Sequence, residues 1–79
     1  MFDFKNTKRI RNAIIGFELG KQADSNKVFI IVSNVLISKH ERLVYADVTI
    51  NHYLDGHSEA YLMCTYPFML IDKLIGVEA

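Results

Sequence analysis

Hydrophobic residues near the start of the chain recur with the spacing of an α-helix. Between Asn6 and about Lys21, apolar side chains fall at i, i+3, i+4 and i+7, whereas charged side chains fall elsewhere around the turn. The four apolar positions are Ile10, Ala13, Ile14 and Phe17. Asp3, Asn6 or Thr7 can cap this segment and Gly20 can end it. The pattern therefore predicts an amphipathic helix with one face on a core.

Three segments rich in β-branched and aromatic residues follow, and each predicts a strand. They cover residues 27–38, 43–54 and 57–66. Residues 39–42 form the loop between the first two strands. Asp55 and Gly56 are expected to join the second pair as a two-residue type I′ turn.

The apolar stretch 67–76 opens with Pro67 and predicts a short helix that ends at Gly76, although it also fits a fourth strand. The sequence thus predicts one α+β domain over residues 1–79. Its expected architecture is an N-terminal helix, a three-stranded antiparallel meander and a short C-terminal helix, arranged in two layers.

The two loops set a register for the predicted sheet and divide its residues between two faces. The four-residue loop places Ile31 opposite Ile50, and the two-residue turn places Ile50 opposite Tyr61. In the same register Ile37 lies opposite Val44, and His52 lies opposite Glu59. The face expected to carry the core contains Phe29, Ile31, Val35, Ile37, Val44, Ala46, Val48, Ile50, Tyr61 and Met63, with Ser33 and Thr65 as its polar members.

The opposite face of the predicted sheet is more apolar than a solvent-exposed face should be. It holds Val28, Ile30, Val32, Leu36, Tyr45, Tyr53, Leu62 and Tyr66 around a polar row of Asn34, Asp47, Thr49 and Cys64. Large apolar patches with tyrosines mark interaction surfaces. We expect a partner or dimer interface formed by Val32, Leu36, Tyr45, Tyr53, Leu62 and Tyr66. The alternative is that residues 67–79 cover this face within the same subunit.

Composition narrows the class of protein. Of the 79 residues, 51% are hydrophobic and 11% aromatic, which excludes a disordered chain. Nine basic residues balance nine acidic ones, so a global basic excess for nucleic acid or anionic membranes is missing. The single cysteine favours a reducing, cytoplasmic setting. No stretch predicts a signal peptide or a membrane span.

A short basic run precedes and enters the predicted first helix. It consists of Lys5, Lys8, Arg9 and Arg11. The run is favoured as a solvated helix face, and the alternative is an anion or phosphate-backbone contact. Nucleic-acid binding through these residues is therefore a second function hypothesis.

Two histidines flank the predicted turn, in the pattern His52-x-x-Asp55-x-His57. A metal site is not expected, because the turn itself requires Asp55 and zinc usually needs a third or fourth protein ligand. A cross-strand pair between His52 and Glu59 is the simpler interpretation. No metal and no cofactor are assigned.

No sequence motif of known catalytic chemistry is present. Cys64 lies within a predicted strand, where a lone cysteine usually packs as a small hydrophobe. The row Asn34, Asp47, Thr49 and Cys64 remains a candidate small-ligand or enzymatic site. The leading hypothesis is a non-enzymatic regulator, adaptor or inhibitor, of the kind that phages and mobile elements also encode. It would act on another protein and form a homodimer.

Overall fold

The computed structural model describes residues 7–78 and confirms the predicted α+β order. The C-terminal segment forms a helix, so the alternative of a fourth strand is wrong. The elements are α1 (Thr7–Gly20), the 3₁₀ turn η1 (Ser25–Lys27), β1 (Val28–Ser38), β2 (Leu43–His52), β3 (Ser58–Pro67) and α2 (Phe68–Glu78).

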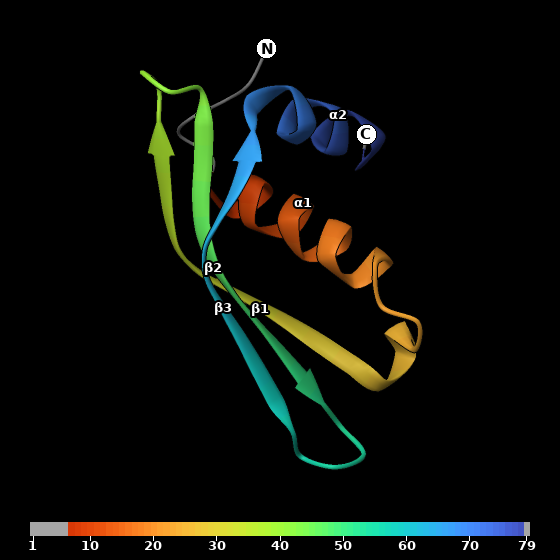
Figure 1. Cartoon of the computed structure of the whole chain (residues 1–79). Helices are drawn as coiled ribbons and strands as arrows, with labels where there is room; N and C mark the ends of the chain where they lie inside the picture. The colour runs from red at the N-terminus through yellow and green to blue at the C-terminus, as the bar shows by residue number, and fades with distance from the viewer. Residues whose placement is uncertain (1–6, 79) are drawn as a thin grey trace.

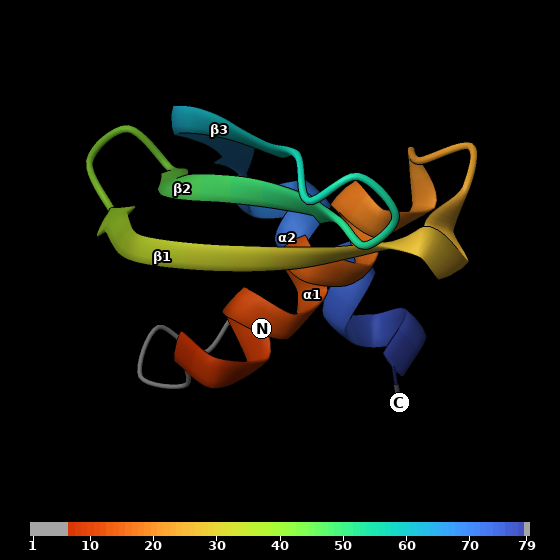
Figure 2. The ribbon, with the colours of Figure 1, turned by 90° about the horizontal axis from the view of Figure 1, so that it is seen from below.

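The three strands form one antiparallel sheet in the order β1-β2-β3. Both helices lie on the same side of this sheet, which bends midway around α1 (Figures 1 and 2). Within residues 7–78, no element covers the other side of the sheet. Nor does this range contain a helix that is long and apolar enough to cross a membrane.

The core lies between the sheet and the helices. From α1 it receives Ile10, Ala13 and Ile14, as the helical spacing predicts, and from α2 it receives Phe68 and Ile71. The strands contribute Val28, Ile30, Val32, Val44, Ala46, Val48, Ile50 and Tyr66. The two helices that cover the sheet have 14 and 11 residues. The sheet extends beyond both helices at the β2–β3 hairpin (Figure 1).

The register of β1 is partly wrong in the sequence prediction. The four-residue loop and the pairing of Ile37 with Val44 are confirmed, and Val35 and Ile37 pack against the core. A β-bulge between Ser33 and Leu36 then adds one residue, so Ile30 rather than Ile31 lies opposite Ile50. A shift of one residue turns each side chain to the other face. Residues Val28, Ile30 and Val32 are consequently buried, whereas Phe29, Ile31 and Ser33 are exposed.

The β2–β3 connection also differs from the prediction. A type I′ turn requires positive φ at both central residues. Only Gly56 has a positive φ in this loop, at 67°. The loop instead spans residues 53–56, with His52 N–H donating to the His57 carbonyl over 2.8 Å. Within the loop, Gly56 N–H donates a second hydrogen bond, to the His52 carbonyl over 3.1 Å.

A second bulge lies in β3, and the side chains that follow it point to the face opposite to the one predicted. Val48 pairs with Tyr61 and Ala46 pairs with Cys64, so Leu62 and Met63 together lie opposite one residue of β2. Tyr61 faces the helices as expected, but so do Cys64 and Tyr66, which were assigned to the opposite face. Met63 and Thr65, expected in the core, are exposed.

Candidate functional site

The side of the sheet away from the helices carries a group of exposed hydrophobic residues that we call the open face. Its most exposed members are Leu62 at 73%, Leu36 at 63% and Tyr53 at 62%, and Ile31 and Phe29 are 45% and 40% exposed. Phe29 and Tyr53 pair their rings at 5.1 Å between centroids. By strand alternation and pairing, we define the open face by Phe29, Ile31, Leu36, Tyr45, Asp47, Thr49, Tyr53 and Leu62. The same pairing places the smaller residues Ser33, Asn51, Ser58, Ala60 and Thr65 on this side.

Four of the six predicted interface residues lie on the open face, and two do not. Leu36, Tyr45, Tyr53 and Leu62 are exposed or half-buried there. Val32 and Tyr66 are 4% and 3% exposed beneath the helices, so their placement on the uncovered side is wrong.

Phe29 and Ile31 take the positions on the open face that sequence reasoning assigned to other residues. Both were expected in the core. Their own residue types gave no signal of exposure, because β1 is apolar at nearly every position from Val28 to Val32. Only the bulge decides which alternate set is buried.

Asp47 is the polar centre of the open face and connects the two bulges. One carboxylate oxygen accepts from the Asn34 side-chain amide at 2.7 Å, and the other accepts from the Met63 backbone N–H at 2.9 Å. Asn34 and Met63 both have φ of 52°, a left-handed conformation that asparagine tolerates better than methionine. Hydrogen bonds from Asn34 and then Met63 lower the pKa of Asp47 below its ordinary value. A carboxylate on β2 therefore holds bulges on both neighbouring strands.

The predicted polar row is divided between the two faces. Asn34, Asp47 and Thr49 remain on the open side, but Cys64 pairs with Ala46 and turns toward the helices. There the Cys64 thiol donates to the Tyr61 carbonyl at 3.7 Å. The four residues thus do not form one ligand site.

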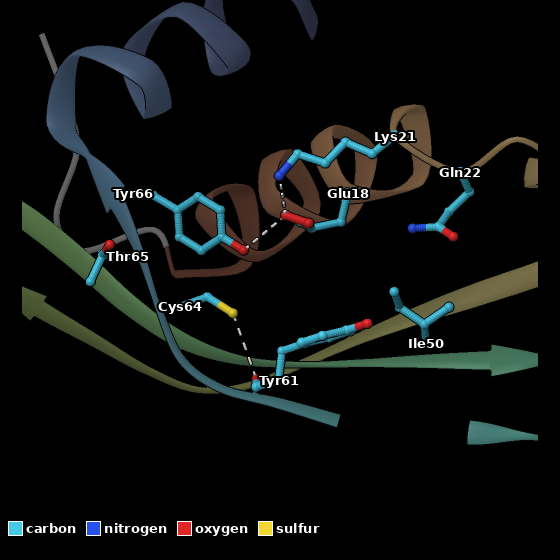
Figure 3. A pocket seen from close by; sticks show the side chains of 8 residues that line it. All are labelled: Glu18, Lys21, Gln22, Ile50, Tyr61, Cys64, Thr65 and Tyr66. Atoms are coloured by element: carbon cyan, nitrogen blue, oxygen red, sulfur yellow. Dashed lines mark hydrogen bonds and ion pairs between the residues drawn. The ribbon is translucent and has the colours of Figure 1, made fainter. Parts of the chain in front are cut away.

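A cavity of about 390 Å³ lies between the end of α1 and the middle of β3 (Figure 3). Glu18 lies at its centre and accepts from the Tyr66 hydroxyl at 3.1 Å, while Lys21 Nζ lies 3.3 Å from the same carboxylate oxygen. Burial, followed by the negative charge of Glu18, raises the pKa of the Tyr66 hydroxyl far above its usual range. The described lining residues include no histidine that could act as a base for Cys64. The cluster fixes α1 against β3.

A third cluster lies at the exposed hairpin end of the sheet. Glu59 Oε2 is 3.2 Å from His52 Nε2, and Glu59 Oε1 is 3.9 Å from His57 Nε2. One ligand atom from each of the three residues lies within 4.8 Å of the others. The expected pairing of His52 with Glu59 is present as a side-chain contact, and Asp55 serves the turn by accepting from His57 N–H at 3.0 Å. Sequence reasoning did not bring His57 into this group.

The basic run is only partly within the described residues. Lys5 lies outside them. Lys8, Arg9 and Arg11 are exposed on the first turns of α1, where the positive end of the helix dipole disfavours cations.

Comparisons with known proteins found no relative of this chain. No family model matches the chain, and no curated protein or solved structure matches it significantly.

Proposed function

We propose that this chain is a non-enzymatic protein-interaction domain that binds through the open face, and that the occupant of this face is a second copy of the chain. The single observation that carries the proposal is the exposure of Ile31, Leu36 and Leu62 on one uncovered side of the sheet. Several large apolar side chains exposed on one uncovered sheet face are typical of an interaction surface.

The charges of the molecule favour self-association over binding of a strongly charged partner. Asp47 is the one formal charge among the residues that define the open face, and each of its carboxylate oxygens already accepts one hydrogen bond within the chain. The whole chain has zero net charge, so two copies do not repel each other. Apolar residues around a satisfied polar group resemble the centre of a protein interface.

The two ends of the sheet complement each other. The β1–β2 loop carries Lys39, Glu41 and Arg42, with one net positive charge, and the opposite end has a net negative charge. That opposite end contains Asp24, Lys27 and Asp55. A two-fold axis that reverses strand direction between stacked sheets would place the positive end of each copy over the negative end of the other.

The size of the face indicates a weak dimer. Strands of ten residues, spaced about 4.8 Å apart and rising about 3.3 Å per residue, give a projected area of roughly 14 by 33 Å per copy. This area is below that of a standard protein interface of about 800 Å² per partner. The dimer should therefore dissociate on dilution, and added salt should weaken it.

Sedimentation velocity over a dilution series tests the proposal. The wild-type chain should pass from dimer to monomer as it is diluted, whereas Ile31→Lys should stay monomeric. Met69→Lys is the matched control, because Met69 is 81% exposed on α2, outside the open face, and this variant should dimerise like the wild type. A monomeric wild type at every concentration, or an Ile31→Lys variant as dimeric as the wild type, would overturn the proposal.

Nucleic-acid binding by Lys8, Arg9 and Arg11 is the alternative function. The exposure of all three side chains on α1 supports it. Binding of this kind weakens steeply with salt because counterions are released from the phosphates. Absorbance at nucleic-acid and protein wavelengths during the same sedimentation runs distinguishes the two functions.

A further inference from the structure

The hairpin end of the sheet brings together three side chains that suit a transition-metal ion. His52 ends β2, and its backbone N–H bonds directly to the His57 carbonyl across the loop. Glu59 follows His57 by two positions in an extended segment, so both side chains lie on the same face of the hairpin. The backbone thus aligns all three residues without help from the rest of the fold.

We propose that His52, His57 and Glu59 form a binding site for a divalent transition ion of the Zn²⁺ class. Two imidazoles and one carboxylate form a ligand set that open zinc sites use. Zinc bonds of about 2.0–2.1 Å in tetrahedral geometry separate neighbouring ligand atoms by roughly 3.4 Å. Glu59 Oε2 lies 3.2 Å from His52 Nε2 and Glu59 Oε1 lies 3.9 Å from His57 Nε2, and one ligand atom from each residue lies within 4.8 Å of the others, which is near this value before any ion draws them together.

The arrangement needs only side-chain adjustment to close around an ion. The rings of His52 and His57 are tilted by 34° with centroids 5.4 Å apart, and each Nε2 faces one oxygen of the Glu59 carboxylate. All three side chains are partly exposed, which leaves room for an ion to enter and for water to complete its coordination.

Without an ion, the trio is an exposed cross-strand group. Exposed ion pairs contribute little to stability. An ion that binds the folded hairpin and not the unfolded chain would stabilise it by mass action. The site would therefore link the ends of β2 and β3, the part of the sheet that extends beyond the helices (Figure 1).

The hard cations Mg²⁺ and Ca²⁺ are poorer candidates. Both prefer sites built from oxygen ligands, and His52 and His57 offer nitrogen. The proposal does not depend on the proposed dimer, because His52 and Glu59 alternate with the open-face residues along β2 and β3.

NMR of the untagged, chelator-treated chain during titration with ZnCl₂ tests the site. The ring ¹⁵N signals of His52 and His57 should shift together and saturate at one Zn²⁺ per chain. His40 is the internal reference, because it lies in the β1–β2 loop at the opposite end of the sheet. Shifts spread equally over all three histidines without saturation, or no shifts at all, would overturn the proposal.

Calorimetric titration of variants completes the test. His57→Ala and the conservative Glu59→Gln should each weaken Zn²⁺ binding by more than roughly tenfold, since loss of an outer-sphere partner alone costs 10–100-fold. His40→Ala should bind Zn²⁺ like the wild type, and MgCl₂ should give no heat of binding. Far-ultraviolet circular dichroism confirms that each variant folds. Equal affinity of Glu59→Gln and the wild type would show that Glu59 is no ligand and reject the three-residue site.

Discussion

The two faces of the sheet differ most clearly when β1 and β2 are compared. On β2, the even positions from Val44 to Ile50 are buried and the odd positions are mostly polar, as expected for a strand with one solvent-exposed side. On β1, Ile30 is 7% exposed and the adjacent Ile31 is 45% exposed, although the two side chains are identical. Folding therefore explains the hydrophobic residues on only one face of β1. Folding does not account for those on the other face, and the proposed dimer would bury them.

The test with the largest expected effect replaces one isoleucine on each face of β1. Ile30→Ala should lower the free energy of unfolding by about 2–5 kcal/mol, because it opens a cavity in the core. Ile31→Ala should lower it by less than about 1 kcal/mol, because the side chain is already half solvated. Urea unfolding at a concentration where the chain is monomeric measures both changes.

If Ile30→Ala does not fold, Ile30→Val tests the same position, and it should lower the free energy of unfolding by about 0.5–1.5 kcal/mol. Equal losses for the two alanine variants would contradict the assignment of Ile30 to the covered face.

A smaller test concerns the covered face, where Tyr66 joins β3 to Glu18 on α1. Tyr66→Phe should lower the free energy of unfolding by about 0.5–1.5 kcal/mol, the usual net value of one hydrogen bond. The folded state raises the pKa of Tyr66, so its stabilising effect is present below the unfolded tyrosine pKa of about 10 and declines as pH rises above it.

Spectrophotometric titration near 295 nm measures this effect. Tyr66 should ionise at higher pH than a tyrosine of the unfolded chain, and Tyr66→Phe should remove that late component. Ionisation of all tyrosines together while the chain remains folded would contradict the buried contact.

The smallest test concerns the open face and its carboxylate. The pKa of Asp47 is lowered in the folded state, so the stability it provides is present above the unfolded aspartate pKa of about 3.9 and is lost as pH falls through the folded value. Asp47→Asn should therefore unfold with a shallower dependence on pH in this acid range. Thermal melts between neutral and acid pH compare the variant with the wild type.

Ser33→Ala is the control, since Ser33 pairs with Asp47 across the strands but is not one of the donors to its carboxylate described above. A wild-type and an Asp47→Asn profile of identical shape would show that the carboxylate does not hold the bulges.

Much of the architecture could be predicted from the chain. The helical spacing from Ile10 to Phe17, the β-branched strands and the four-residue loop at 39–42 all specify local structure, and each is present. The register failed beyond the bulges, because an extra residue in a strand leaves no regular mark in a run that is apolar at every position. Asn34 is compatible with a left-handed residue, but the same conformation at Met63 could not be anticipated.

The residues of the candidate sites also divide into those that alternation placed correctly and those that it did not. Leu36, Tyr53 and Leu62 were found from alternation. No bulge separates Leu36 from the β1–β2 loop, and the β2–β3 loop is longer than expected by two residues, an even change that leaves the faces of Tyr53 and Leu62 as predicted. Cys64 was lost from the polar row because the β3 bulge turned it around. Alternation alone places His57 and Glu59 on one face, but the two-residue turn set His52 opposite Glu59, whereas the longer loop pairs the His52 backbone with His57 and so brings all three together.

The sequence by itself determined the order of helices and strands, since local periodicity and turn residues act over a few positions. Only the tertiary structure decided which side chains of β1 and β3 meet the helices. Asp47 contacts Asn34 and Met63, which are 13 and 16 residues away in the chain, and these contacts accompany the two bulges that reverse the faces. Such a choice depends on strands meeting in space, and no local pattern encodes it.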